Sequence, residues 1–194
     1  MSPTAKQAWE QLLEGNARFR SGKPAHASHT PEDLAALYEE QNPIAAVIAC
    51  SDSRVDPAVV FDQPLGSIFV SRVPGNVVSD SVRWMVEMAV GTLNVPIVVA
   101  MAHTGCLAVR GSFDPVYEGQ GAPLRYLIHR AVRSARSSDP DARWREGIEL
   151  NLRQTTRTLE TDCPAVVAAI RSRELAVIPA IYEMESGLVH MLEG

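Results

Sequence analysis

The sequence of 194 residues contains only three cysteines, and no two of them form a Cys-x-x-Cys pair. An odd number of cysteines without regular spacing does not make the disulfide framework of a small secreted domain. The missing Cys-x-x-Cys pair also excludes a thioredoxin-type redox site. We therefore expect free thiols and a cytoplasmic protein, held in a reducing compartment.

Long apolar runs and an excess of positive charge are absent as well. No run approaches the roughly 18 apolar residues of a membrane-spanning helix, and residues 1–20 lack the basic and apolar regions of a signal peptide. The formal net charge is −5, which provides no basic field for nucleic acid. We predict neither a membrane nor a nucleic-acid partner. The arginine-rich stretch 125–146 also contains acids, and we interpret it as a solvated helical surface.

Several motifs that would indicate other chemistry are missing. The sequence has neither of the glycine-rich loops that cradle nucleotide phosphates. It also lacks the His-x-Glu and Pro-Cys-x-x-Cys motifs of zinc nucleobase deaminases. Cysteine phosphatases place an arginine after five intervening residues, whereas Cys50 and Arg54 are separated by three residues, one of them acidic.

The elements that are present predict a mixed α/β fold. Apolar residues make up 46% of the chain, enough for the core of one domain over residues 1–194. The continuous apolar runs 44–50 and 96–102 are typical of parallel strands buried on both faces. With a strand over 67–73 and a helix over 80–94, capped by Asp80, they indicate a mostly parallel central β-sheet flanked by helices.

The ends of the chain are predicted to be helical and then extended. An amphipathic helix reaches about residue 19, and a second helix has Thr30 as its N-cap and Pro31 as its first residue. The pattern is helical from 121–136 through 149–172. Two strands close the chain around a turn at 185–187; the first should extend the parallel sheet and the second should form an antiparallel edge.

Three residues with metal-binding side chains follow the two apolar strands. Cys50 comes directly after the first strand, and His103 and Cys106 follow the second. Ligands of open α/β sheets bind at the carboxyl ends of strands, so these side chains converge if the strands are neighbours. Two cysteines and one histidine are a zinc ligand set of catalytic sites, which leave the fourth position open. Two alternatives remain: a core cysteine near an unrelated loop histidine, and a redox or nucleophilic cysteine.

Two charged residues lie next to Cys50. Asp52 and Arg54 are two residues apart, so both side chains can point the same way from an extended turn. Such a pair beside a metal can orient a bound water. The alternative is a surface ion pair, worth less than about 1 kcal/mol. The third cysteine, Cys163, lies in a predicted helix, and we interpret it as a packed core thiol.

The motifs "CSDSR" and "HTGC", in this order and at this separation, resemble those of the β-class carbonic anhydrases. The resemblance implies a carbonate dehydratase, a lyase that hydrates CO₂ reversibly to bicarbonate and a proton, with one Zn²⁺ per subunit. It implies Cys50, His103 and Cys106 as the zinc ligands. It also implies that Asp52 and Arg54 form the catalytic dyad.

The same resemblance extends to the substrate pocket and to the assembly. It implies that Gln41 hydrogen-bonds the substrate across a dimer interface and that Phe69 forms an aromatic wall of the CO₂ pocket. Leu107 stands where a backbone N–H approaches the substrate. Family members are homodimers, often paired into homotetramers, so a helical arm over residues 1–40 is expected to pack on the partner subunit.

Some positions depart from the family pattern and leave the pocket open to other interpretations. The departures are Val73 and Pro74 in a usual polar loop, Met88 for a tyrosine, Ala102 for a glycine before the histidine, and Leu107 for a glycine after the second cysteine. Val47 replaces a tryptophan of bicarbonate-controlled members, which favours the type without bicarbonate gating. Two alternatives follow: hydrolysis of carbonyl sulfide or carbon disulfide on the same scaffold, and a non-catalytic zinc-containing homologue that binds bicarbonate or a protein.

Overall fold

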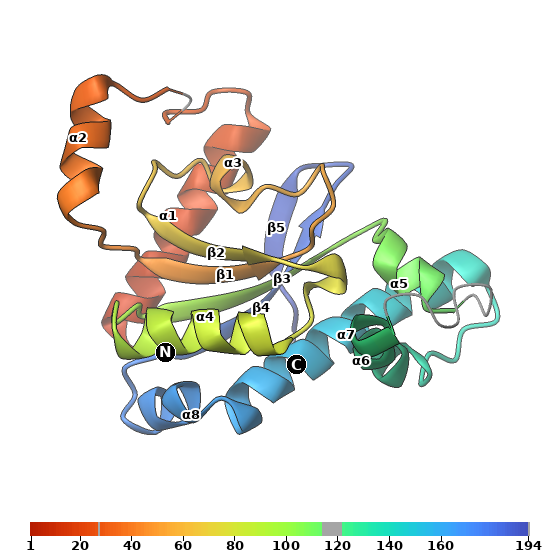
Figure 1. Ribbon diagram of the computed structural model, residues 1–194. Helices are drawn as coiled ribbons and strands as arrows, with labels where there is room; N and C mark the ends of the chain where they lie inside the picture. Colours follow the sequence, from red (N-terminus) through yellow and green to blue (C-terminus); the bar gives the residue numbers. More distant parts are fainter. Residues whose placement is uncertain (27, 114–121, 194) are drawn as a thin grey trace.

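The structure is a computed structural model that describes residues 1–26, 28–113 and 122–193 (Figure 1). Its helices are α1 (Pro3–Arg20), α2 (Pro31–Glu39), α3 (Pro57–Val60), the 3₁₀ helix η1 (Pro74–Asn76), α4 (Asp80–Gly91), α5 (Leu107–Gly111), α6 (Ala122–Val132), α7 (Pro140–Asp162) and α8 (Pro164–Arg171). Its strands are β1 (Ala45–Ala49), β2 (Ile68–Arg72), β3 (Ile97–His103), β4 (Ala176–Glu183) and β5 (Leu188–Met191).

The five strands form one sheet in the order β2-β1-β3-β4-β5, and only the pairing of β4 with β5 is antiparallel. Every residue of β1 and β3 is buried, because both strands are apolar on both faces. The mixed α/β fold with a central, mostly parallel sheet is therefore confirmed. From β1 the chain runs outward to β2 and then returns past β1 to β3. The strand order thus reverses between β1 and β3, the place where open α/β sheets bind ligands.

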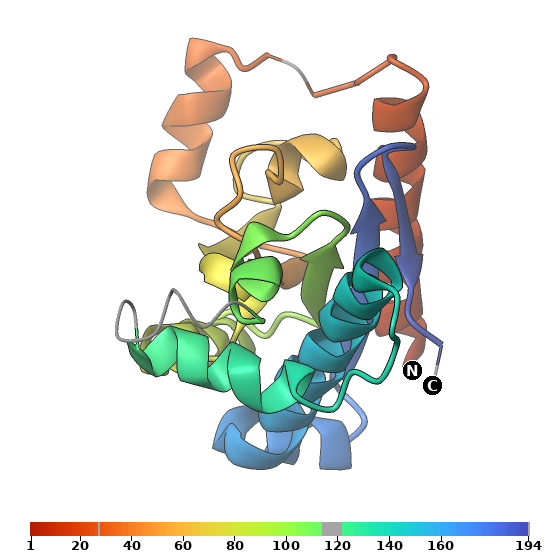
Figure 2. The ribbon, with the colours of Figure 1, turned by 90° about the vertical axis from the view of Figure 1, so that its right-hand side faces the viewer.

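Helices cover both faces of the sheet (Figures 1 and 2). Alternate residues of β1 point to opposite faces, so Ala46 and Ile48 pack with α4, α7 and α8. Val47 packs on the other face with α1 and α3, where Trp9 and Leu12 are buried. The predicted amphipathic N-terminal helix therefore lies against the sheet of its own subunit.

Helix α2 differs from the others because none of its residues is buried. It forms where predicted and begins with a complete capping box. The Thr30 side chain accepts a hydrogen bond from the Asp33 N–H, and the Asp33 side chain accepts one from the Thr30 N–H. Figures 1 and 2 show it standing apart from the sheet and from the helices that cover the sheet. Leu34 and Tyr38 are exposed on it. Its stability in isolation rests on its caps rather than on burial.

Two predicted helix boundaries were wrong. The N-cap of α4 is Ser79, whose hydroxyl accepts from the Val82 N–H, and Asp80 is already helical. The helix predicted over 149–172 is two helices, α7 and α8. They separate at Cys163 because Pro164 forces the preceding residue into an extended conformation. The first residue of the helix predicted over 121–136, Gly121, lies outside the described residues.

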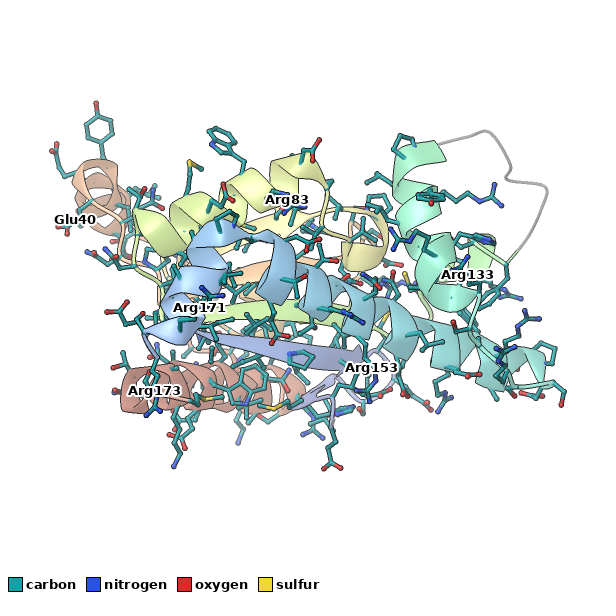
Figure 3. The ribbon with its side chains drawn as sticks, turned by 90° about the horizontal axis from the view of Figure 1, so that it is seen from below. Glu40, Arg83, Arg133, Arg153, Arg171 and Arg173 are labelled. Carbon is teal, nitrogen blue, oxygen red and sulfur yellow. The ribbon has the colours of Figure 1, made fainter. Side chains whose placement is uncertain are left out.

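The arginine-rich stretch forms a solvated surface, as predicted. Arg133 and Arg143 are exposed, and the guanidinium of Arg143 stacks on the ring of Phe113 at 5.0 Å. Figure 3 shows Arg133 just after α6, Arg153 on α7 and Arg171 at the end of α8, in the helical layer that covers one face of the sheet. In the described part of the chain, no helix has both the length and the apolar character needed to cross a membrane.

Candidate metal centre

The sheet brings the three predicted metal ligands to one edge. Cys50 follows the last residue of β1, and His103 is the last residue of β3. Ala49 pairs with Met101 in the neighbouring parallel strand, so Cys50 and His103 leave the sheet side by side. A turn then places Cys106 at the start of α5, and it needs Gly105 because the backbone φ there is +71°.

These three side chains form a buried cluster. The Sγ atoms of Cys50 and Cys106 are 3.9 Å apart, and with a ring nitrogen of His103 all three ligand atoms lie within 4.8 Å of one another. A tetrahedral zinc with Zn–S bonds of about 2.3 Å separates two sulfurs by roughly 3.8 Å. The side chains therefore fit a zinc ion with little rearrangement.

The imidazole of His103 is oriented for metal binding. Its Nδ1 donates to the Thr104 carbonyl oxygen at 2.9 Å and lies 3.0 Å from Met184 Sδ. This bond leaves the lone pair on Nε2, which is buried and has no hydrogen-bond partner among the described residues. Buried polar atoms normally have a partner, and a ligating histidine normally donates its other nitrogen to a carbonyl or carboxylate. The geometry of His103 is that of a metal ligand.

The two thiols share one proton. The hydrogen bond from Cys106 lowers the pKa of Cys50 to about 4, and the N–H of Gly75, 3.4 Å from the Cys50 sulfur, contributes to the shift. The same bond to Cys50, together with burial, raises the pKa of Cys106. At neutral pH the pair by itself thus contains a thiolate at Cys50, and the thiolate is the form of cysteine that binds metals.

Asp52 and Arg54 form a forked ion pair beside the cluster. Arg54 Nε donates to Oδ1 at 2.9 Å, Nη2 to Oδ2 at 2.8 Å, and the Arg54 N–H to Oδ1 at 3.0 Å. These hydrogen bonds hold the pKa of Asp52 well below its usual range. The Asp52 side chain is only 10% exposed, whereas that of Arg54 is 55% exposed. The carboxylate of the pair is thus largely shielded, while its guanidinium is exposed to solvent.

The predicted substrate residues lie at different distances from the surface. Leu107 directly follows Cys106 and is 66% exposed. Phe69, on β2, is half-buried and packs against the helical layer around α4. Gln41 is exposed and lines a surface pocket of about 370 Å³ with residues of α2 and with Gly66. None of the three cluster residues lines that pocket.

Two residues that support the cluster were not predicted from the sequence. Arg72 donates through Nη2 to the Asp52 carbonyl at 2.6 Å and through Nε to the Cys50 carbonyl at 3.2 Å, which fixes the loop between them. Trp144 donates its indole N–H to the Cys106 carbonyl at 2.9 Å. Neither residue has a metal-binding side chain or a spacing that relates it to the ligands, so no sequence signal could have identified these roles. Cys163 is fully buried and lies apart from the cluster, as predicted for a packed thiol.

The family follows from comparison with known proteins. The family model described as carbonic anhydrase matches residues 45–189. Carbonic anhydrase 2 of Mycobacterium tuberculosis is 33% identical over 184 residues, which cover 93% of this chain and 89% of the relative. The chain belongs to the β-class carbonic anhydrase family. The prediction of a carbonic anhydrase lyase is thereby confirmed.

Solved β-carbonic anhydrases share the fold. The β-carbonic anhydrase CcaA superposes with a TM-score of 0.74 at 25% identity, and the match covers 96% of this chain and 95% of that one. One of two tetrameric β-carbonic anhydrases of Sordaria macrospora has a TM-score of 0.74 at 23% identity, with 97% and 98% of the chains covered. At 23% identity, the similarity to the Sordaria macrospora protein establishes the fold alone.

Proposed function

We propose that this β-class carbonic anhydrase catalyses the zinc-dependent, reversible hydration of CO₂ to bicarbonate and a proton. One Zn²⁺ per subunit would be held by Cys50, His103 and Cys106. The observation that carries the proposal is the buried, partnerless Nε2 of His103, which lies with two cysteine sulfurs in a cluster of zinc-ligand dimensions. Family membership supports the reaction, and the donor set supports the metal.

The described residues supply three ligands, which is the number in catalytic zinc sites that keep one position for water or substrate. When bound, zinc lowers the pKa of water to about 7 and so supplies hydroxide at neutral pH. Asp52 remains ionised because Arg54 donates to both of its carboxylate oxygens. Oδ2 accepts only from Nη2 of Arg54, so it retains a lone pair that can accept a hydrogen bond from water and direct the attacking oxygen toward CO₂.

We also propose that the active form is a homodimer or a homotetramer. Helix α1 packs on its own sheet, so α2 is the part of the 1–40 arm that would contact the partner. An amphipathic helix is stabilised in water mainly by packing, and α2 has no fully buried residue within its own subunit. Gln41 follows α2 and would reach the partner's substrate, whereas Phe69 and Leu107 would line the pocket of their own subunit.

Metal analysis combined with stopped-flow CO₂ hydration at mildly alkaline pH tests the proposal. We expect about one zinc per chain and a rate well above that of buffer. Cys106→Ser should lose metal and activity together, and Asp52→Asn should lose activity while it retains metal. A zinc-loaded protein that hydrates CO₂ no faster than buffer would overturn the proposal.

A further inference from the structure

Helix α7 makes two buried polar contacts with the turn η1, which follows β2. Asn151 Nδ2 donates to the Gly75 carbonyl at 2.6 Å, and Thr155 Oγ1 donates to the Asn76 carbonyl at 3.2 Å. The two donors are one helical turn apart and are 1% and 3% exposed. They lie on the face of α7 that carries the buried Leu152. A buried polar side chain is unfavourable unless it is hydrogen-bonded. The hydrogen bonds to the turn therefore account for the burial of these two polar residues.

The conformation of the turn is uncommon. Gly75 and Asn76 both have positive φ, 67° and 47°, in adjacent positions. Glycine adopts positive φ without steric cost and asparagine tolerates it, so the two residue types suit the turn. A side chain at residue 75 would also crowd Ile128, since a Cβ there would lie 2.7 Å from Ile128 Cδ1. Gly75 is therefore fixed by its backbone angles, by Ile128 and by Asn151.

The fixed glycine points its amide at a proposed metal ligand. The N–H of Gly75 donates to Cys50 Sγ at 3.4 Å, while its carbonyl accepts from Asn151. Rotation of the Gly75 backbone would break both hydrogen bonds. Asn151 thus acts on the Cys50 sulfur through Gly75 and does not itself contact the cluster.

We propose that Asn151 is a positioning residue of the metal centre, which keeps the Gly75 amide on the Cys50 sulfur. The inference rests on the proposed metal site and adds a residue from α7 to its support. An N–H bond to a thiolate withdraws electron density from sulfur and fixes the direction of its lone pairs. Hydrogen-bond partners behind metal ligands typically contribute about 10–100-fold to metal affinity or activity. We expect a loss within that range when Asn151 is removed.

Cobalt(II) substitution provides the test, because the sulfur-to-cobalt charge-transfer band reports the electron density on sulfur. In Asn151→Leu, which removes the donor at similar volume, we expect this band to move to lower energy and cobalt affinity to fall about 10–100-fold. Thr155→Val is the matched control: it removes the neighbouring buried hydrogen bond of the same helix but leaves the Gly75 carbonyl bonded. It should lower the unfolding temperature without moving the band.

A second measurement uses the wild-type protein and so does not depend on whether Asn151→Leu folds. With the NMR-active isotope of cadmium at the site, the Gly75 amide proton should show a scalar coupling to the metal through the N–H···S bond. A missing coupling, an unmoved band in Asn151→Leu or an equal shift in Thr155→Val would each overturn the role of Asn151. Wild-type protein that takes up no metal would overturn the metal centre and this inference together. Wild-type protein that takes up metal and hydrates CO₂ would leave the proposed function standing whatever Asn151 does.

Discussion

Arg18 on α1 and Asp62, just after α3, are joined by a short ion pair, with Nε 2.5 Å from Oδ2. The same carboxylate accepts hydrogen bonds from the N–H groups of Ala25 and His26. It therefore holds the segment that follows α1 against the loop after α3. Burial by itself would raise the pKa of Asp62, but the donors from Ala25, Arg18 and His26 outweigh it and lower the pKa. Asp62 therefore fixes where the connection to α2 begins.

We predict that Asp62→Asn destabilises the fold by about 1.5–3 kcal/mol at neutral pH, the usual range for a hydrogen bond to a charged group. Asparagine tolerates the left-handed φ of 43° at this position, so the backbone can stay in place. The folded-state pKa of Asp62 lies below the unfolded value of about 3.9, so its contribution is complete above that pH and is lost as the pH falls below it.

Urea unfolding of both proteins at neutral pH and below pH 4 measures this contribution. The difference in unfolding free energy between wild type and Asp62→Asn should shrink on acidification. Asp33→Asn, which changes an exposed carboxylate on α2, is the matched control and should show a much smaller effect at neutral pH. A difference for Asp62→Asn that is independent of pH would show that its ionisation does not stabilise the fold.

For Asp52 we predict a catalytic effect with little structural change. Asp52→Asn removes the negative charge that Arg54 stabilises but keeps the shape of the side chain, so CO₂ hydration should fall about 10–100-fold. Zinc content should stay at the wild-type level, because Asp52 is not one of the three clustered donors. Stopped-flow rates and metal analysis on the same samples provide both values.

Asp56→Asn is the matched control for Asp52→Asn. Asp56 is the exposed N-cap of α3, and asparagine also serves as an N-cap. Its carboxylate lies 3.9 Å from Arg72 Nη1 in a partly exposed ion pair, which contributes little, so the substitution should leave the rate within about twofold. Equal losses of activity in the two variants would indicate a general effect of charge near the site instead of a role for the Asp52 carboxylate.

The sheet was predictable because its signal is local. The buried run of β1 is apolar at every position, and that of β3 is apolar at every position before His103, as is typical of parallel strands covered on both faces. The positions at which helices end were harder to predict. Apolar spacing continues through Cys163, and only Pro164 marks the separation of α7 from α8. The short α3, α5 and η1 contain too few residues to show a helical period.

The proposed ligands were predictable for a similar reason, since each follows a strand end that the sequence reveals. Their supports were not. Trp144 contacts Cys106 from 38 residues along the chain, and Asn151 contacts Gly75 from 76 residues away. Both bind backbone carbonyls, which every residue possesses, so no pairing of side-chain types marks them. Such contacts depend on how α7 lies across the sheet, and one sequence does not contain that information locally.

The two kinds of cysteine should respond differently to the same substitution. Cys106→Ser replaces a soft sulfur donor in the cluster, so zinc content should fall well below one per chain. Cys163→Ser changes an equally buried thiol that lies outside the cluster, and it should retain zinc while it loses stability. Metal analysis after dialysis, with thermal unfolding on the same samples, distinguishes the two. Loss of zinc in Cys163→Ser would contradict the assignment of the ligand set.

The exposed face of α2 provides the last prediction, which concerns assembly. Leu34 and Tyr38 are 53% and 86% exposed, and the helix that carries them has no fully buried residue in its own subunit. If α2 packs on a partner, Leu34→Asp places a charge in that interface twice, once per subunit, and should weaken association on the order of a hundredfold or more. Sedimentation equilibrium over a range of concentrations measures this change, with Glu32→Gln on the same helix as the control. An unchanged mass distribution in Leu34→Asp would show that association, where it occurs, uses another surface.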